Sequence, residues 1–431
     1  MAQFRTDINQ LDDKISTRYE VVMLADNYGN INAGTGGTAV DAFGRSRIAQ
    51  PYTLFDSQHI YDDNTYWSES NSGTASAYQA NESALNLTIN GTNGSYIYRE
   101  TKRAFPYQPG KSLLVINSFA FNEGKANLRQ RIGYFDTKNG IFLEQNGTDL
   151  YLVRRSFVNG IVEETRVLQS NWNFDKFDGT GPSQRDLDVS KANIFWLDVE
   201  WLGVGAVRCG FVVDGQMQIA HVFYHDNVGT TTYMTSATLP LRIEIENTAD
   251  TGSASSLKQI CNSVISEGGY GKKVRPKVLR RSTNVAITDD VWKPLVALRL
   301  NSNRLNSVVL PGTYRIYAST SPADVELAWV RNPTSLTVPA SPGGWVQNGN
   351  VDECVDATAV DVTGGIFEST DYISTSNQSG GAAVGEFDYN FDTQLGRTIG
   401  GTSDVLVLVA RTIISNGDTI ARTAATYYDL T

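Results

Sequence analysis

The first regular pattern of hydrophobic residues in the chain is helical. Four apolar side chains follow one another at steps of four, three and four residues: Phe4, Ile8, Leu11 and Ile15. This spacing places them on one side of a short helix. A helix of about three turns is marginal alone, so it needs a surface to pack against. This surface could be the rest of the same chain, or the same helix in other copies of the chain, packed together in a short bundle.

From about Tyr61 onward, the pattern changes to short strands separated by tight turns. Five turn dipeptides supply the backbone conformations that hairpins need: Asn139-Gly140, Asn146-Gly147, Asn159-Gly160, Asp214-Gly215 and Asn416-Gly417. The pattern predicts successive strands over 129–164, one long hairpin over 207–225 and a closing hairpin over 404–430.

The segment "NIFWLDVEWLG" shows the strand pattern in its clearest form. Its odd positions, Phe195, Leu197, Val199 and Trp201, are all apolar, whereas its even positions change from Ile194 and Trp196 to Asp198 and Glu200. We interpret it as a strand with one fully buried face and one half-buried face.

The strand pattern pauses at Glu267–Ser282, which is rich in glycine and then in basic residues, and it restarts afterwards. The sequence therefore predicts an all-β protein, a jelly-roll-like β-sandwich with a second C-terminal β-domain and an N-terminal arm. The expected parts are an arm over 1–58, with a short helix and an extended anchor stretch, a sandwich over 59–275 and a C-terminal β-domain over 276–431.

The charge balance excludes some partners. The 36 basic and 46 acidic residues give a net charge of −10, which argues against binding to nucleic acid or to an anionic membrane. The three cysteines, Cys209, Cys261 and Cys354, are far apart and form no CxxC pair, and the first residues lack the apolar segment of a signal peptide. We expect the chain to fold in a reducing cytosol, without a disulfide framework.

Three pairs of side chains are candidates for chemistry. Asp198 and Glu200 lie two residues apart on one strand, as do Glu244 and Glu246, and sandwich glycosidases use carboxylates in this way. Such enzymes generally present a third acidic residue on the strand, but Trp201 and Leu202 follow Glu200, so we interpret this pair as structural. The same interpretation applies to Glu244 and Glu246.

His221 and His225 are four residues apart, about 13 Å along a strand, which is too far for one metal ion. We therefore predict a non-enzyme, with no catalytic, cofactor-binding or metal-ligating residues.

Aromatic side chains offer a further possibility. Tyr61, Tyr66 and Trp67 are clustered with carboxylates in "YDDNTYWSES". Sugars stack on exposed rings and hydrogen-bond to Asp and Asn, so this cluster is a candidate glycan platform. Core packing and a subunit contact are its alternatives.

Several segments resemble, in the same order, virion structural proteins of tailed bacteriophages, especially marine and cyanobacterial ones. The segments are "VDAFGRSRIAQPYTLFDSQ", "FPYQPGKSLLV", "RIGYFDTKNGIFLEQNG", "WNFDKFDGTGPS", "WLGVGAVRCGFVVDG" and "LPLRIEIEN", and together they span about residues 40–250. The resemblance implies a structural part of a virion, made in the host cytoplasm. It does not distinguish capsid decoration from a collar, tail or fibre part.

In such a part, the N-terminal arm is suited to attachment. Its expected partner-binding residues are the helical stripe Phe4, Ile8, Leu11 and Ile15, followed by Phe43, Arg45, Arg47, Tyr52 and Phe55. We expect other virion proteins as partners and a homo-oligomer, with a trimer as the first hypothesis. The alternative function is a carbohydrate-binding module that recognises a host surface glycan, and a polysaccharide depolymerase is the third.

Overall fold

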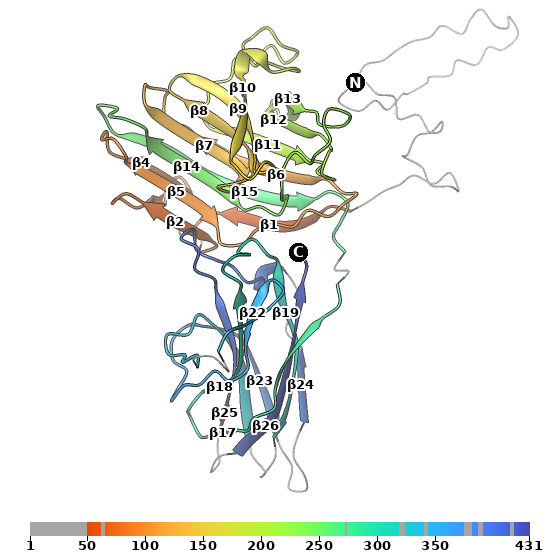
Figure 1. The fold of residues 1–431 in the computed structure, drawn as a ribbon. Coiled ribbons are helices and arrows are strands. Elements are labelled where there is room, and N and C mark those ends of the chain that lie inside the picture. The colour runs from red at the N-terminus through yellow and green to blue at the C-terminus, as the bar shows by residue number, and fades with distance from the viewer. Residues whose placement is uncertain are drawn as a thin grey trace, which may run out of the picture. The chain divides into compact units, whose positions relative to one another are not determined.

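The computed structural model describes residues 50–431 apart from 62–64, 272–273, 319–323, 340–343, 375–381, 387–390 and 414–417. The helix expected near the N-terminus lies outside the described residues. Pro51–Thr431 form one compact unit (Figure 1). Its described elements are β-strands and two short 3-10 helices, η1 (Gln169–Asn171) and η2 (Phe391–Thr393), so the all-β prediction is confirmed. Neither of these helical segments is long and apolar enough to cross a membrane.

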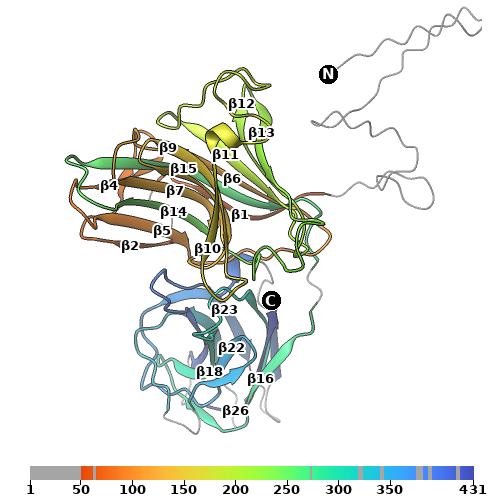
Figure 2. The same ribbon diagram turned by 45° about the horizontal axis from the view of Figure 1, so that its top comes forward.

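Two antiparallel sheets form the first β-sandwich (Figure 2). The back sheet has the order β13 (Gln216–Phe223), β12 (Val207–Val213), β11 (Asn193–Val199), β6 (Leu113–Ala120), β15 (Ser255–Ser266), β4 (Ala84–Ile89) and β3 (Ala77–Gln79), and β1 (Tyr52–Gln58) also pairs with β15. The front sheet has the order β10 (Glu163–Leu168), β9 (Asp149–Ser156), β8 (Gly140–Asn146), β7 (Leu128–Phe135), β14 (Leu241–Asn247), β5 (Tyr96–Thr101) and β2 (Trp67–Asn71).

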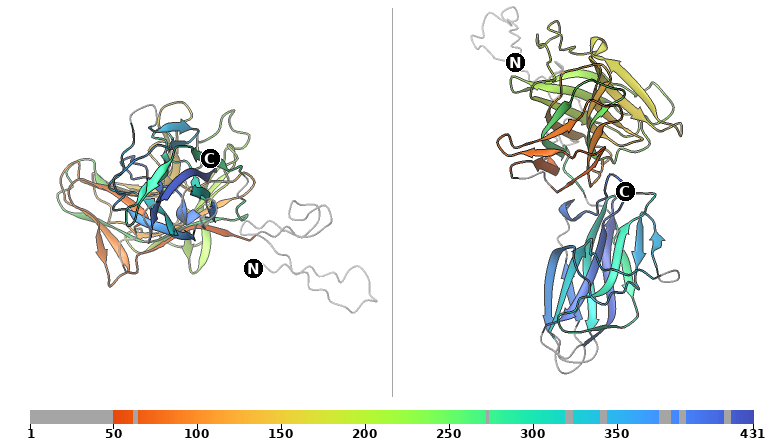
Figure 3. Two further views of the ribbon diagram at one scale, coloured as in Figure 1. Left: turned by 90° about the horizontal axis from the view of Figure 1, so that it is seen from below. Right: turned by 90° about the vertical axis from the view of Figure 1, so that its left-hand side faces the viewer.

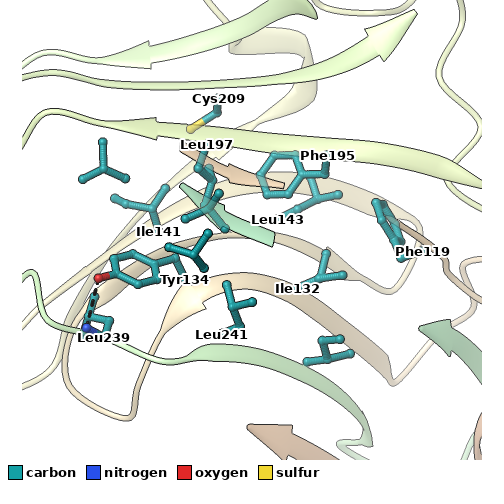
Figure 4. Close-up of a cluster of buried hydrophobic side chains, with 14 of the residues drawn as sticks. Phe119, Ile132, Tyr134, Ile141, Leu143, Phe195, Leu197, Cys209, Leu239 and Leu241 are labelled. Atoms are coloured by element: carbon teal, nitrogen blue, oxygen red, sulfur yellow. Dashed lines mark hydrogen bonds between the residues drawn. The ribbon is translucent and has the colours of Figure 1, made fainter. Parts of the chain in front are cut away.

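The core of this sandwich lies between the two sheets (Figure 4). Leu197 and Phe195 of the back sheet pack with Ile132 and Leu143 of the front sheet, and all four are completely buried. Burying one such side chain contributes about 1.5–3 kcal/mol to stability. The buried hydroxyl of Tyr134 donates to the carbonyl oxygen of Ala237 at 2.6 Å, so its polar atom is satisfied within the core.

The expected hairpins of this sandwich are present. Strands β7, β8, β9 and β10 pair in sequence order, and β12 pairs with β13 across Asp214 and Gly215. These two turn residues have φ values of 51° and 76°, the left-handed conformation that a two-residue hairpin turn requires. The alternation predicted for β11 is confirmed for Phe195, Leu197 and Val199, which face the core, whereas the strand ends before Trp201.

Two further sheets, from the second half of the chain, form another sandwich (Figure 3). One sheet has the order β16 (Lys277–Arg281), β26 (Asp418–Asp429), β19 (Val309–Ala318) and β24 (Ala382–Glu386), with β17 (Val285–Ile287) also on β26. The other has the order β21 (Val346–Asn348), β22 (Val351–Cys354), β18 (Lys293–Leu300), β25 (Val405–Thr412), β20 (Asp324–Arg331) and β23 (Ile366–Ser374). Trp329 and Tyr314 meet in the core that these two sheets share.

The prediction of a closing C-terminal hairpin is wrong. Strand β25 pairs with β18 and β20, whereas β26 pairs with β16, β17 and β19 in the opposite sheet. The reason is visible in β25 itself, whose two faces are both apolar. Leu406 and Leu408 enter the core between the sheets, and Val407 and Val409 enter a separate cluster on the other side. Such a strand belongs in the centre of a sheet, with a neighbour on each side.

The start of the first sandwich also differs from the expectation. Strand β1, at Tyr52–Gln58, lies within the span assigned to the arm, but it pairs with β15 of the back sheet. The two sandwiches also share contacts, since Val308, Leu310 and Phe391 join the core of the first one. The division of residues 59–431 into two domains at residue 276 stays a prediction.

Candidate functional site

The outer side of the front sheet, the side turned away from the core, is polar and charged. Strand register aligns its side chains in rows that cross the sheet. One row consists of Asp149, Asn146, Arg129, Glu246 and Tyr96 on β9, β8, β7, β14 and β5. We call it the open row, because Asp149 is exposed and the other four side chains are half-buried.

The next two rows are increasingly buried. The middle row contains Tyr151, Glu144, Arg131, Glu244 and Tyr98. The last contains Val153, Phe142, Gly133, Arg242 and Glu100. We call the last row the closed end. Glu144 and Glu100 are almost completely inaccessible to solvent, although they lie on the outer side of a sheet.

Arginine–glutamate pairs connect these rows. Arg131 donates from Nε to Glu144 at 2.6 Å and from Nη1 to Glu244 at 2.9 Å. Arg242 donates from Nε to Glu244 at 2.6 Å and also pairs with Glu100. Charge-assisted hydrogen bonds of this kind are stronger than neutral ones, and they fix both partners in orientation.

The closed end is covered by residues that follow η2. Arg397 forms an ion pair with Glu100, and its backbone N–H donates to the carbonyl oxygen of Lys102 at 2.7 Å. Nearby, Gln394 donates from Nε2 to the carbonyl oxygen of Ala104 at 3.0 Å. These contacts exclude solvent from one end of the charged surface and leave the open row accessible.

Burial and charge act in opposite directions on Glu244. Burial alone would raise the pKa of its carboxyl, but the positive charges of Arg242 and Arg131 outweigh burial and hold the pKa below its usual value. The carboxylate is therefore ionised at neutral pH. A glycosidase of the sandwich type needs one carboxyl that stays protonated as the general acid, and Glu244 is unsuited to that role.

At the accessible end, Glu246 organises the open row. Arg129 donates from Nε to Glu246 at 2.6 Å, and the hydroxyl of Tyr98 donates to its other oxygen at 2.5 Å. Burial, followed by the hydrogen bond to Glu246, raises the pKa of Tyr98, so the phenol stays protonated. Arg129 and Glu246 of the open row are thus held in place before any ligand arrives.

Tyr96 completes the open row with an aromatic surface. Its ring stacks on Tyr98, with centroids 4.5 Å apart and planes inclined by 28°. Strand register places Arg242 on the other side of Tyr98, where its guanidinium lies 5.5 Å from the ring centroid. Both faces of Tyr98 are therefore occupied. Within the described part of the chain, the ring contact that Tyr96 makes is with Tyr98, and its side chain is half-buried.

The aromatic cluster singled out in the sequence does not form a platform. Trp67 is 5% exposed, and its indole N–H donates to the hydroxyl of Ser57 at 2.9 Å. Tyr66 packs edge-on against Phe55 and beneath the guanidinium of Arg103. Tyr61 is 90% exposed. The three rings do not share one surface, because Trp67 begins a strand and points into the core.

The two carboxylate pairs noted in the sequence have different surroundings. Asp198 lies on β11 of the back sheet and pairs with Arg208 of the neighbouring strand, while Glu200 follows the end of β11. Glu244 and Glu246 share the outer side of β14, as their alternation indicates. The structural interpretation of Asp198 is supported by its arginine partner.

The histidines of the 221–225 segment have separate partners. His221 lies on β13, and its Nδ1 accepts the backbone N–H of Asn173 at 3.3 Å. His225 follows β13 and contacts the carbonyl oxygen of Thr231 through Nε2 at 3.0 Å. Among the described residues, no group of three or more histidine, cysteine or acidic side chains could hold a metal ion.

Of the expected arm residues, Phe4, Ile8, Leu11, Ile15, Phe43, Arg45 and Arg47 lie outside the described residues. Phe55 is 3% exposed in the core of its own sandwich, against Trp67 and Phe105. Tyr52 is 36% exposed and lies against Tyr270 and Phe391. Phe55 is therefore not available as an anchor on a neighbouring subunit, because strand β1 turns it inward.

The site residues predicted from the sequence did not include Tyr96, Arg129, Asn146 or Asp149. A signal was present in the alternating charges of "LRQRIGY" and "LRIEIEN", since opposite charges on neighbouring strands favour cross-strand pairs. It could not identify the site, because the pairing of β14 with β7 and β5 joins residues more than 100 positions apart.

Comparison with known proteins gives structural similarity without a sequence family. No protein-family model and no curated protein matches the sequence. Solved structures that match include the carbohydrate recognition domain of Emp47p, with 11% identity, a TM-score of 0.32 and coverage of 51% of this chain and 97% of that one. A second is the CBM2 module of the evolved Dit of Lactobacillus casei BL23 phage J-1, with 8% identity, a TM-score of 0.35 and coverage of 52% and 100%.

A third match is a GH16 protein of a Bacteroides ovatus mixed-linkage glucan locus, solved in complex with the G4G4G3G product. It shows 10% identity, a TM-score of 0.34 and coverage of 49% of this chain and 99% of that one. At these identities and TM-scores, the matches establish neither a ligand nor an activity for this chain.

Proposed function

We propose that this chain is a non-enzymatic carbohydrate-binding protein and that the open row of the front sheet is its binding site. The observation that carries the proposal is the half-buried ring of Tyr96, which stacks on Tyr98 through one face and shares a row with the fixed Arg129–Glu246 pair; its other face is the one proposed to receive a sugar. A sugar ring can stack its C–H groups on such a face while its hydroxyls hydrogen-bond to planar polar side chains. Glu246, Arg129 and Asn146 supply acceptors and donors of this kind in the same row.

Preorganisation supports this assignment. The Arg129–Glu246 pair and the Tyr98 hydroxyl hold the polar atoms at fixed positions, so a ligand would not have to order them. Rigid binding groups improve affinity because less conformational entropy is lost on association. We propose that the chain is not a glycosidase because Glu244, whose carboxyl is ionised between two arginines, cannot serve as a general acid.

A glycan array followed by titration calorimetry tests the proposal. The wild-type chain should bind at least one oligosaccharide, and Tyr96→Ala should weaken that binding by at least about tenfold, as expected for a central aromatic contact. Tyr317→Ala is the matched control, since Tyr317 is a 43% exposed tyrosine on β19 of the second sandwich. Equal losses in the two variants, or no binding to any glycan, would contradict the proposal.

We also propose that the chain is a structural component of a tailed-phage virion. The sequence segments that resemble this family, ordered over about residues 40–250, support the proposal. Those segments that lie in the described residues mostly form strands of the first sandwich, such as β6 and β7, so they define a scaffold rather than a site. A glycan-binding sandwich on a particle would contact the surface of a host cell.

Mass spectrometry of purified particles tests the virion role, and a cryo-EM map gives the copy number and the neighbours. Tens to hundreds of copies would favour capsid decoration, and about a dozen or fewer would favour a collar or tail position. Attachment through the N-terminal arm and assembly into a trimer stay predictions. Particles that lack the chain would overturn the virion role without affecting the glycan-binding role.

A further inference from the structure

The charges of the open row define the class of sugar that the site accepts. We infer that it binds neutral glycans and rejects uronic-acid, sialic-acid and sulfated ones, and that Glu246 and Asp149 set this selectivity. The inference rests on the proposed glycan-binding function and deepens it. It follows from how the arginines of the outer side are paired.

Each arginine on the outer side of the front sheet already has a carboxylate partner. The pairs are Arg129 with Glu246, Arg131 with Glu144 and Glu244, Arg155 with Glu164, Arg166 with Glu144 and Glu164, and Arg242 with Glu244 and Glu100. An acidic sugar is usually recognised by an arginine whose fork is free to take two oxygens of its carboxylate or sulfate. No arginine on this face of the described sheet is free in that way.

The remaining charges of the open row favour a neutral ligand. Asp149 and Glu246 are negative and Arg129 is positive, so the row carries a net charge of −1 from its three charged residues. Asp149 is exposed and accepts the hydroxyl of Tyr151 at 3.2 Å. The whole chain has a net charge of −10, which adds a repulsive field for an anionic glycan. A like charge in a binding site is an effective means of rejecting the wrong ligand.

Glu246 acts on selectivity through Arg129. As long as Glu246 accepts the Nε–H of Arg129 and pairs with its Nη2, that edge of the guanidinium is occupied, and an incoming carboxylate would have to compete with Glu246 for it. Replacing Glu246 by Gln removes the negative charge and keeps an acceptor for the Tyr98 hydroxyl. The positive charge of Arg129 then becomes available to an acidic sugar.

The experiment uses the full chain and a glycan array on which neutral oligosaccharides are matched with their uronic-acid and sulfated counterparts. For the wild type we expect a preference of at least about tenfold for the neutral member at low salt. The variant Asp149→Asn/Glu246→Gln should bring the preference close to unity. Glu82→Gln is the control, since Glu82 pairs with Lys258 of the back sheet and should leave the preference unchanged.

Salt separates charge repulsion from steric rejection. If the preference is electrostatic, raising the ionic strength should weaken it while the affinity for the neutral member stays constant. Asp149→Asn alone, at an exposed position, should lower the preference in part even if the double variant folds poorly. An acidic glycan that binds the wild type as well as its neutral counterpart would overturn the inference and leave the glycan-binding role standing. A preference that neither salt nor Asp149→Asn changes would also overturn it. If no glycan bound the wild type, both the inference on selectivity and the proposed glycan-binding function would be contradicted.

Discussion

The two ends of the front sheet carry the same kinds of residues in different surroundings. At the closed end, Glu100 lies between Arg242 and Arg397, and its side chain is 1% exposed. In the open row, Glu246 pairs with Arg129, whose side chain is 26% exposed. Both are arginine–glutamate pairs on the outer side of one sheet. The difference lies in the residues after η2, which cover one end and leave the other accessible.

Burial decides what such a pair contributes. A buried carboxylate between two arginines is held there because removing one partner would leave an uncompensated charge away from water. The Arg129–Glu246 pair, with side chains 26% and 14% exposed, keeps some contact with water, which screens the two charges and reduces what the pair contributes. The closed end is therefore sensitive to the loss of either partner of its ion pairs, whereas the open row can exchange its contacts with water for contacts with a ligand.

The largest predicted effect comes from breaking the closed end. Glu100→Gln leaves Arg242 and Arg397 without the charge that both of them face. We expect the free energy of unfolding to fall by about 3–5 kcal/mol, the usual loss when one partner of a buried ion pair is removed. Urea denaturation followed by tryptophan fluorescence measures it.

Glu82→Gln provides the matched control for this loss. Its partner Lys258 is 34% exposed and Glu82 itself 50% exposed, so the expected change is about 1 kcal/mol or less. Equal losses for Glu100→Gln and Glu82→Gln would mean that the ion pairs of the closed end contribute no more to stability than a surface pair.

The next largest effect is expected from acid, which acts on Glu244 in the middle row. The pKa of Glu244 is held below its usual value of 4.5, so its contribution is fully present above pH 4.5 and is lost as the pH falls through the lower pKa of the folded state. In that range of pH, the free energy of unfolding of the Glu244→Gln variant should change less with pH than that of the wild type, by up to about 1.4 kcal/mol per pH unit. Unfolding curves between pH 3 and 6 measure it, and parallel curves would show that Glu244 does not titrate below its usual range.

Much of the first sandwich could be predicted because its signals are local. The alternation of Phe195, Leu197 and Val199 identifies their strand, and Asp214-Gly215 identifies a hairpin. The same local signals failed at the C-terminus. They identify β25 and β26 as strands, but the choice of partner depends on which faces are buried, and β25 is buried on both.

The candidate site could be predicted only in part. Glu244 and Glu246 attract notice because they alternate on one strand, but their meaning depends on Arg131 and Tyr98 from other strands. Burial of the closed end depends further on Arg397, almost 300 residues from Glu100 in the chain. The "YDDNTYWSES" cluster was misleading for the opposite reason. Its rings are neighbours in sequence, but the strand that starts at Trp67 turns that residue inward.

A smaller effect on stability, with a clear effect on binding, is expected in the open row. Arg129→Gln removes a partner of Glu246 whose side chain is 26% exposed, so it should cost less than Glu100→Gln, about 1 kcal/mol. Its affinity for a neutral glycan should nevertheless fall several-fold, because Glu246 loses the group that orients it. Calorimetric titration beside a urea curve measures both. A large loss of stability with unchanged affinity would show that the open row is structural, like the closed end.

The smallest effect is expected on the other sheet of the same sandwich. Asp198→Asn with Glu200→Gln replaces the carboxylate pair of "NIFWLDVEWLG" by neutral side chains of similar size. Asp198 pairs with Arg208, whose side chain is 43% exposed, so we expect a change of about 1 kcal/mol or less in the free energy of unfolding. No change in glycan binding is expected, because the back sheet does not carry the open row. Thermal unfolding and the glycan array check these two expectations, and incubation with host polysaccharide checks a third, that neither protein releases sugar. Sugar release by the wild type that the double variant abolishes would make the back sheet, and not the front sheet, the functional side of this sandwich.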